Sequence, residues 1–491
     1  MKVKKILASV FTLTMLTMLI TPTNVSAADE VTGNFEFDLQ ANVYDYGEAI
    51  DNVSFSIKPI DPTGLAGAEV DLSTIDNNTF EIKATATNPY TTLPVEAPQY
   101  GVYTDVERVI EGISVSTDGR TVSIDLQTTY NGAGQGTLNY VAGDVARNLS
   151  MDISYTVTQV EDFSLKNGTI IKADSTYTQG TIISSEVEKF SGATYNGINY
   201  QSFTPTNAND GEKHPLIIWF HGNGEGGYNA AQNNDSQLRA NRGAIAFATD
   251  EAQQIFGGAY VIAPQAPDTW YYNYTNGYIE TMTDLINTYA SNNNVDTDRI
   301  YVYGCSAGGY MTTRMAIENP ELFAAVVPTC AAVNVAPIRG GVETTAEEIE
   351  TLVDNNIWFI HSLDDTTVVP ETSSQWMHSL LPNSLYTEYA SVVNEGVSYP
   401  GHWSWIYTAL NLPINSDGDS IWKWTAKQTL FEEVIEPTPN PTPVTPTPTP
   451  NQTTGSTVVK TGDVTTTSLY SSLGMMALGT MIILINKKKR C

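Results

Sequence analysis

The sequence predicts two globular domains, an all-β sandwich followed by a mainly parallel β-sheet flanked by helices. From residue 34 to 162, short runs that alternate apolar and polar residues are separated by turn residues, which is typical of antiparallel strands. Beyond residue 165, continuous apolar runs alternate with amphipathic segments, as in sheets built from β–α–β units. A chain of 491 residues is also too long for one compact core. We therefore expect the sandwich at residues 29–164 and the second domain at 165–435.

The chain begins with a segment typical of exported proteins. Residues 1–27 combine a lysine-rich start, an apolar core from Ile6 to Ile20 and the small residues Val25-Ser26-Ala27. This pattern predicts a secretory signal peptide, because the apolar core is short of the ~20 residues that a membrane-spanning helix needs. We therefore expect a secreted protein.

The sandwich shows no cluster of catalytic residue types. Its clearest strands are expected at 35–39, 53–57, 121–125 and 151–156. We expect it to pack against the second domain or to support a homo-oligomer. Carbohydrate binding has less support, since no aromatic platform can be read from these runs.

A glycine-rich loop opens the functional part of the second domain. Residues 221–227, His-Gly-Asn-Gly-Glu-Gly-Gly, directly follow the apolar strand 215–220. We expect the backbone N–H of Asn223 to face a developing oxyanion and His221 to be structural. A flexible linker is the alternative, although linkers seldom follow such a strand directly.

The most specific motif is Gly304-Cys305-Ser306-Ala307-Gly308. It follows the apolar run 299–303 and precedes a helix-like segment at 309–319. In this context the motif predicts a nucleophile elbow, where side chains at the two glycine positions would collide with neighbouring elements. Ser306 is the predicted nucleophile, and the backbone N–H of Ala307 is a predicted oxyanion donor.

An acid and a base follow the serine in chain order. The apolar run 356–361 leads to Asp364 and Asp365, at the carboxyl end of a strand, where open α/β sheets hold their sites. Beyond them, His378 falls in an amphipathic segment, whereas His402 sits in a loop after a strand expected at 385–393. His402 is therefore the predicted base, and a carboxylate would hold its imidazole in the tautomer that takes the serine proton.

Aromatic residues near these motifs are candidates for substrate binding. We select Trp270, Tyr271 and Trp403, with core packing as the equal alternative. The 5 histidines show no metal-ligand spacing, so we expect no metal, and no motif indicates a cofactor.

Four motifs in chain order, at 221–227, 304–309, 361–365 and 401–405, carry a family resemblance. With them, residues 165–430 resemble an α/β-hydrolase esterase of the group that includes feruloyl esterases and polyhydroxybutyrate-depolymerase-like enzymes. The likeness is strongest to secreted esterases that carry an immunoglobulin-like domain ahead of the α/β hydrolase. It implies a serine carboxylester hydrolase acting on feruloyl, acetyl or other short acyl esters, for example of an acylated plant polysaccharide.

The resemblance also bears on the triad acid. In related hydrolases the acid commonly lies four residues after a histidine that ends the strand, which favours Asp365 over Asp364. The spacing onward to Pro370 is one residue longer than usual, so Asp364 stays open. Two departures from related esterases are Gly226, where arginine often follows the glutamate, and the lack of a cysteine beside His402, which argues against the tannase-like subgroup.

The C-terminal end indicates attachment to a cell surface. Residues 436–457 are rich in proline and threonine, which favours an extended spacer. Residues 458–491 resemble the sorting signal of Gram-positive wall proteins, which implies that a sortase joins Thr461 to peptidoglycan. Val458 and Val459 replace the usual Leu-Pro, so a plain membrane anchor is the alternative.

The net charge and the cysteines limit the possible partners and disulfides of this chain. The net charge of −30 argues against nucleic acid as a partner, because phosphate backbones are bound through Lys and Arg. Cys491 ends the tail, and Cys305 and Cys330 are expected either as a bridge near Ser306 or as two buried thiols.

Three functions remain open. A serine esterase is favoured by the motif set. A serine peptidase of the prolyl-oligopeptidase type shares the catalytic fold, but it adds a propeller with a repeat of ~40 to 50 residues, and the first domain shows no such period. The third is a non-catalytic, wall-displayed binding protein.

Overall fold

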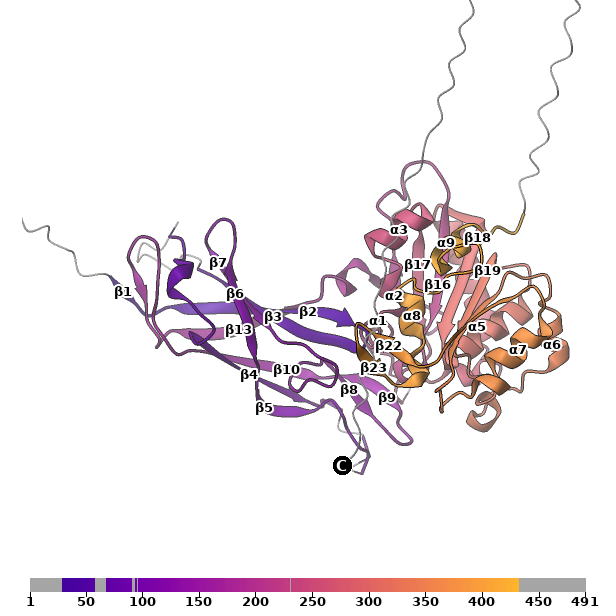
Figure 1. Ribbon diagram of the computed structural model, residues 1–491, viewed down its shortest axis with the longest axis horizontal. Helices are drawn as coiled ribbons and strands as arrows, with labels where there is room; N and C mark the ends of the chain where they lie inside the picture. Colours follow the sequence, from indigo (N-terminus) through magenta and orange to yellow (C-terminus); the bar gives the residue numbers. More distant parts are fainter. Residues whose placement is uncertain (1–28, 58–67, 91–92, 95, 230, 432–491) are drawn as a thin grey trace, which may run out of the picture. The chain divides into compact units, whose positions relative to one another are not determined.

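The computed structural model describes residues 29–57, 68–90, 93–94, 96–229 and 231–431 (Figure 1). The predicted signal peptide at 1–27, the spacer at 436–457 and the tail at 458–491 with Thr461 lie outside the described residues. Of the described residues, those between 29 and 183, here called the β-region, form mainly strands, and those between 184 and 431, here called the α/β-region, alternate strands with helices.

Two sheets form most of the β-region. The larger has the order β13-β2-β3-β7-β6 and the smaller the order β10-β4-β5. Phe37 and Val53 of the larger sheet share one buried hydrophobic cluster with Ile82 and Val157 of the smaller. The β-strands of these sheets and of the β8–β9 hairpin are β2 (Asn34–Tyr44), β3 (Gly47–Ser56), β4 (Phe80–Thr87), β5 (Tyr103–Glu107), β6 (Ile110–Val115), β7 (Thr121–Leu126), β8 (Leu138–Val141), β9 (Arg147–Ser150), β10 (Asp152–Gln159) and β13 (Thr176–Ile183).

The β-region extends past the predicted domain boundary after residue 164. A small sheet joins β1 (Glu30–Val31), β12 (Ile170–Ile171) and β11 (Phe163–Ser164). Strand β13 then pairs in parallel with β2, with Tyr177 opposite Phe35. The change of sequence texture near residue 165 therefore precedes the end of the sheet, because this last strand is held by pairing with a strand more than a hundred residues away.

An eight-stranded sheet organises the α/β-region, in the order β14-β15-β17-β16-β18-β19-β20-β21. Strand β15 pairs antiparallel with both β14 and β17, and from β17 to β21 every neighbouring pair is parallel. The strands are β14 (Ser191–Tyr195), β15 (Ile198–Phe203), β16 (His214–Phe220), β17 (Tyr260–Gln265), β18 (Val295–Cys305), β19 (Ala325–Thr329), β20 (Trp358–Ser362) and β21 (Leu385–Tyr389).

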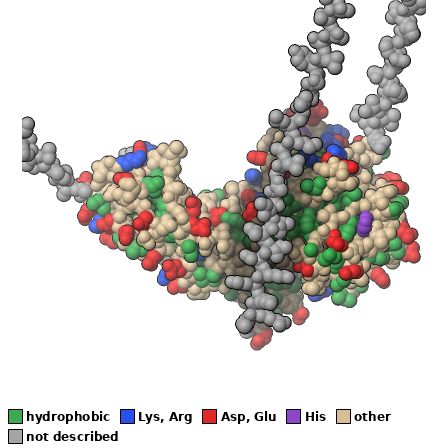
Figure 2. Space-filling model, viewed as in Figure 1, with side chains coloured by type: hydrophobic (Ala, Val, Ile, Leu, Met, Phe, Trp, Pro, Cys, Tyr) green, Lys and Arg blue, Asp and Glu red, His purple; other side chains and the backbone are tan. Residues whose placement is uncertain are grey.

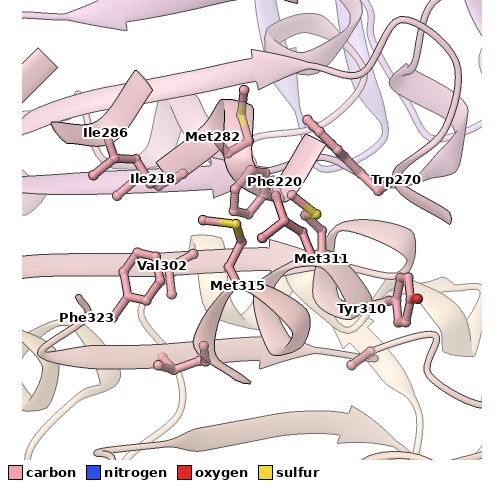
Figure 3. Packing of buried hydrophobic residues seen from close by; sticks show 14 of the residues in the cluster. Ile218, Phe220, Trp270, Met282, Ile286, Val302, Tyr310, Met311, Met315 and Phe323 are labelled. Carbon is pink, nitrogen blue, oxygen red and sulfur yellow. The ribbon is translucent and has the colours of Figure 1, made fainter. Parts of the chain in front are cut away.

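Helices cover both faces of this sheet, so its central strands are apolar on both sides. On one face, Ile218 and Phe220 of β16 pack with Met282 of helix α4 and Met311 of helix α5 (Figure 3). Trp219, between them in the sequence, belongs to the cluster on the other face. The helices are α1 (Ser236–Arg239), α2 (Gly243–Ala246), α3 (Asp250–Phe256), α4 (Tyr278–Asn292), α5 (Ala307–Glu318), α6 (Ala346–Glu350), α7 (Ser374–Leu380), α8 (Trp405–Ala409) and α9 (Ile421–Ala426).

The strand predicted at 385–393 is in fact two elements. Strand β21 ends at Tyr389, and β22 (Val392–Asn394) turns back to pair with β23 (Val397–Tyr399). The hairpin contacts the β-region, since the amide of Asn394 donates a hydrogen bond to Asp45 at 2.7 Å. An ion pair of 2.5 Å between Glu48 and Arg239 joins the two regions at a second point.

The surface is acidic, as the composition requires. Figure 2 shows Asp and Glu side chains spread over the visible face with fewer Lys and Arg, in keeping with 54 acidic against 24 basic residues in the chain. Within the part of the chain that the structure describes, no helix is long and apolar enough to cross a membrane.

Candidate active site

Ser306 sits at the turn between β18 and α5 in a strained backbone conformation, with φ 55° and ψ −118°. Such a conformation costs of order 1–3 kcal/mol and persists only where the surroundings enforce it. Here the Ser306 N–H donates to the carbonyl of Thr329 at 3.1 Å, and its own carbonyl accepts from the N–H of Ala332 at 3.0 Å. A Cβ at Gly308 would lie 2.0 Å from the carbonyl oxygen of Phe220, so this position has no room for a side chain.

His402 lies between Ser306 and Asp365. Its Nε2 is 2.9 Å from the Ser306 Oγ, and its Nδ1 is 2.7 Å from Oδ2 of Asp365. Because a carboxylate only accepts, Nδ1–H donates to Asp365 and Nε2 is left to accept the serine hydroxyl proton. The structure thus brings together the three side chains selected from the sequence, whereas His378, on α7, is hydrogen-bonded to Ser384.

Asp365, and not Asp364, reaches the imidazole. The Asp365 carboxylate is buried and also accepts the backbone N–H groups of Thr367 and Val368 at 2.8 and 2.9 Å. Burial alone would raise its pKa, but hydrogen bonds from His361 and His402 hold that pKa far below its usual range. Asp364 instead accepts a hydrogen bond from the Ser362 hydroxyl at 2.5 Å.

His361, which in the sequence marks only the expected end of a strand, is a further partner of Asp365. Its ring is fully buried, and Nε2 lies 3.1 Å from Oδ2 of Asp365 and 3.0 Å from the Val368 carbonyl. Since both neighbours are acceptors, Nε2–H donates to them and Nδ1 accepts from the Ser374 hydroxyl at 2.9 Å. His361 therefore orients the acid that orients His402.

The glycine-rich loop 221–227 presents Asn223 at the first position of a 3-10 turn, Asn223–Glu225. Asn223 and Ala307 each begin a helical turn, so neither backbone N–H has an acceptor within its own turn. The Asn223 side chain is held by a hydrogen bond from the Thr269 hydroxyl at 2.8 Å. His221 is buried with its pKa lowered to about 3 by burial, and it bridges Gly222 O and the N–H of Ala266, as expected of a structural residue.

The β-region holds this loop in place, a contact that no local sequence pattern predicts. Arg147 on β9 donates to the carbonyls of Gly227 at 3.0 Å and Asp268 at 2.7 Å. A Cβ at Gly226 would lie 2.0 Å from the Asp268 carbonyl oxygen. The arginine that related esterases often carry after the glutamate thus has no room at this position, and a guanidinium reaches the loop from the β-region instead.

Glu225 is the buried carboxyl of the same loop. Its Oε1 accepts a hydrogen bond of 3.0 Å from the amide of Asn148, the neighbour of Arg147 on β9. Burial raises the pKa of Glu225 to about 7, against the opposing effects of the Asn148 hydrogen bond and the charge of Arg147.

A cleft of about 920 Å³ opens above Ser306 and His402. Two of the three predicted substrate-binding residues, Tyr271 and Trp403, line it. Trp270 does not, and this prediction is corrected: its side chain is 0% exposed and packs against Phe220, with ring centroids 5.1 Å apart. The indole is part of the hydrophobic core, because it packs in the buried cluster that also holds Phe220 and Met282.

The two cysteines near the site are separate thiols. Cys305 and Cys330 are both buried and free, so the bridge considered from the sequence is not formed. Sγ of Cys330 lies with ligand atoms of Asp365 and His402 within 4.8 Å of one another, a spacing that a metal ion could use. His402 is already hydrogen-bonded to Asp365 on one side and to Ser306 on the other, so a metal would compete with that arrangement, and the expectation of no metal stays a prediction.

Comparison with known proteins gives partial matches. A model of the prolyl oligopeptidase family matches residues 267–340. A poly(3-hydroxybutyrate) depolymerase of Ralstonia pickettii is 30% identical over 103 residues, which cover 18% of this chain. The chain spans about a fifth, 20%, of the length of this curated relative.

Among solved structures, the crystal structure of a thermostable esterase matches 80% of this chain and 99% of its own with 25% identity and a TM-score of 0.64. Est1E from Butyrivibrio proteoclasticus matches 45% of this chain and 93% of its own with 15% identity and a TM-score of 0.31. The sheet order and the likeness to the thermostable esterase identify an α/β-hydrolase fold in the α/β-region. The likeness to this esterase and to the depolymerase supports a carboxylic ester hydrolase.

Proposed function

We propose that this protein is an extracellular serine carboxylester hydrolase that acts through Ser306, His402 and Asp365. The observation that carries the proposal is the unbroken series of hydrogen bonds from Ser306 Oγ to His402 and from His402 to Asp365. The strained backbone of Ser306 supports it, since such strain is typical of functional sites.

The chemistry follows from these contacts. His402 Nε2 takes the hydroxyl proton as Ser306 Oγ attacks the ester carbonyl carbon, and Asp365 stabilises the imidazolium that forms. The carbonyl oxygen becomes an oxyanion, for which the N–H groups of Asn223 and Ala307 are the proposed donors. Collapse expels the alcohol, which takes its proton from His402 and leaves an acyl group on Ser306. Water, deprotonated by the same imidazole, then releases the acid and restores the serine.

The substrate proposed is a small ester or an acylated polysaccharide, with feruloyl and acetyl groups as the first acyl groups to test. The β-region would be an immunoglobulin-like sandwich that also supports a homo-oligomer. The pattern at 1–27 supports secretion, and the tail pattern supports attachment to peptidoglycan by a sortase at Thr461 or retention by a membrane anchor. Cell fractionation before and after deletion of residues 458–491 tests this location, and an enzyme found equally in the medium in both cases would contradict it.

A serine peptidase is the second candidate, because the prolyl oligopeptidase family model matches residues 267–340. That match covers α4 and the elbow at Ser306. In the described residues 29–183, the strands form two main sheets, a small sheet and a hairpin, and we see no repeated blade as in a propeller.

One experiment separates these candidates. Purified protein is treated with a fluorophosphonate, and the adduct is mapped by mass spectrometry; turnover of 4-nitrophenyl acetate, methyl ferulate and peptide 4-nitroanilides is measured in parallel. We expect one adduct on Ser306, ester turnover, and loss of both in Ser306→Ala with unchanged thermal stability. Turnover of anilides but not esters would favour the peptidase, and a folded protein without an adduct would refute an activated Ser306.

A further inference from the structure

The cleft above Ser306 is much larger than a short acyl group requires. At about 920 Å³ it lies near the upper end of the range of about 300–1,000 Å³ typical of pockets for drug-sized ligands. Its walls come from both regions, with Trp403 and Trp405 beside His402 and Tyr46, Tyr100 and Tyr140 from the β-region.

Tyr100 and Tyr140 form an exposed aromatic pair on the β-region side of the cleft, here called the tyrosine platform. Their side chains are 72% and 42% exposed, and their rings are stacked with centroids 6.4 Å apart and an angle of 25°. The backbone fixes the pair, because the Tyr100 N–H donates to the Tyr140 carbonyl at 3.0 Å. Two stacked rings left open to water give a preformed flat surface with little conformational entropy to lose on binding.

The tyrosine platform lies against the loop that carries Asn223. A Cβ at Gly224 would be 3.9 Å from the Tyr140 ring, which is ordinary van der Waals contact. A ligand ring on the platform therefore lies in the same cleft as Ser306 and next to the proposed oxyanion donors.

The chemistry of the cleft indicates what this ring is. Arg339 is the only Lys or Arg among the described residues that line it, which disfavours a polyanionic ligand such as a phosphate polymer. Neutral amides, including the exposed Asn131, stand among the aromatic rings. A sugar ring matches this combination, because it has a flat C–H face for stacking and a rim of hydroxyl groups for the amides.

We propose that the tyrosine platform is a binding subsite for the sugar rings of a neutral polysaccharide whose ester group enters at Ser306. The inference rests on the proposed esterase function and adds to it a subsite for the sugar part of the substrate and a binding role for the β-region. The alcohol leaves beside His402, so a polysaccharide alcohol would extend from there into the cleft that the platform also lines.

The first test compares Tyr100→Ala and Tyr140→Ala in the full-length protein, with Phe431→Ala as the matched control. Phe431 is 70% exposed and is not among the residues that line the cleft. We expect KM for acetylated xylan to rise about ten-fold in each tyrosine variant, the size of a typical aromatic contact. Turnover of 4-nitrophenyl acetate should change less than about two-fold, since this substrate does not reach the platform. The control should match wild type on both substrates.

The second test measures binding without turnover. Ser306→Ala protein is run in native gels that contain arabinoxylan, glucomannan or galactan, with and without the platform changes. Retardation by at least one polysaccharide, lost in Tyr100→Ala and kept in Tyr100→Phe, is the expected result. No retardation by any of them, or equal losses on xylan and 4-nitrophenyl acetate, would overturn the subsite. If wild type turns over no ester at all, the proposed function fails instead, whatever the gels show.

Discussion

Replacing Glu225 with glutamine is expected to change how the stability of the fold depends on pH. The side chain is 7% exposed, and burial raises its pKa from 4.5 to about 7. Between these values the folded chain keeps a proton that the unfolded chain has released, so the free energy of unfolding falls as pH rises. The stability that the protonated Glu225 side chain provides, relative to the ionised one, is fully present below pH 4.5. It is lost as the pH rises through about 7, the pKa of Glu225 in the folded state.

The size of the effect follows from the two pKa values. A difference of about 2.5 pKa units corresponds to about 3 kcal/mol, of which about 2.5 kcal/mol is lost between pH 5 and pH 8. Glutamine cannot ionise, and the amide of Asn148 can turn to match it. The stability of Glu225→Gln relative to wild type should therefore rise by about 2.5 kcal/mol between pH 5 and pH 8.

Urea denaturation of wild type and Glu225→Gln at pH 5 and pH 8 measures how the stability difference between the two proteins changes with pH. Any effect of the substitution on packing that does not depend on pH cancels in this comparison. Glu81→Gln, on the exposed side of β4, is the matched control and should show no such change. A relative stability of Glu225→Gln that is the same at pH 5 and pH 8 would refute the reasoning.

Three further predictions test the site and its support. Asp365→Asn should lower kcat for esters by roughly 10⁴-fold through loss of the correct imidazole tautomer, while Asp364→Asn should stay within roughly ten-fold of wild type; the reverse order in steady-state kinetics would contradict the assignment. Gly308→Ala should prevent soluble expression or lower the free energy of unfolding by at least ~3 kcal/mol, because its Cβ would lie 2.0 Å from a backbone oxygen. Gly112→Ala is the control and should express normally, since the nearest atom to its Cβ would be 3.7 Å away. Trp270→Ala should destabilise the fold by about 3–5 kcal/mol in thermal denaturation, and unchanged stability with a raised KM would restore its predicted role in substrate binding.

Local pattern was enough to predict the backbone structure around Ser306, the proposed nucleophile. The strand before Ser306, the glycines at 304 and 308 and the helix after them are all signals within one short segment, and the structure has them as β18, the elbow and α5. The apolar runs of the parallel sheet were equally clear, because buried strands such as β16 have no polar face.

Signals that depend on a distant partner were missed or misread. The inward turn of Trp270 is set by its packing on Phe220 and His221, which no local pattern shows. The run 385–393 has the composition of one strand, but it divides after β21. The next strand, β22, pairs with β23 outside the eight-stranded sheet.

The sequence by itself determined the chemical groups of this protein and their order along the chain, since a strand, a sharp turn and a helix each follow from neighbouring residues. Only the tertiary structure decided which groups meet. Asp365 rather than Asp364 reaches His402. The loop that carries Glu225 is contacted by Arg147 and Asn148 of the β-region, which precede their partners by 80 and 77 residues, and the tyrosine platform lines the same cleft. The physical reason is that hydrogen bonds and ring contacts depend on distance in space, and pairing and packing of the whole sheet determine that distance.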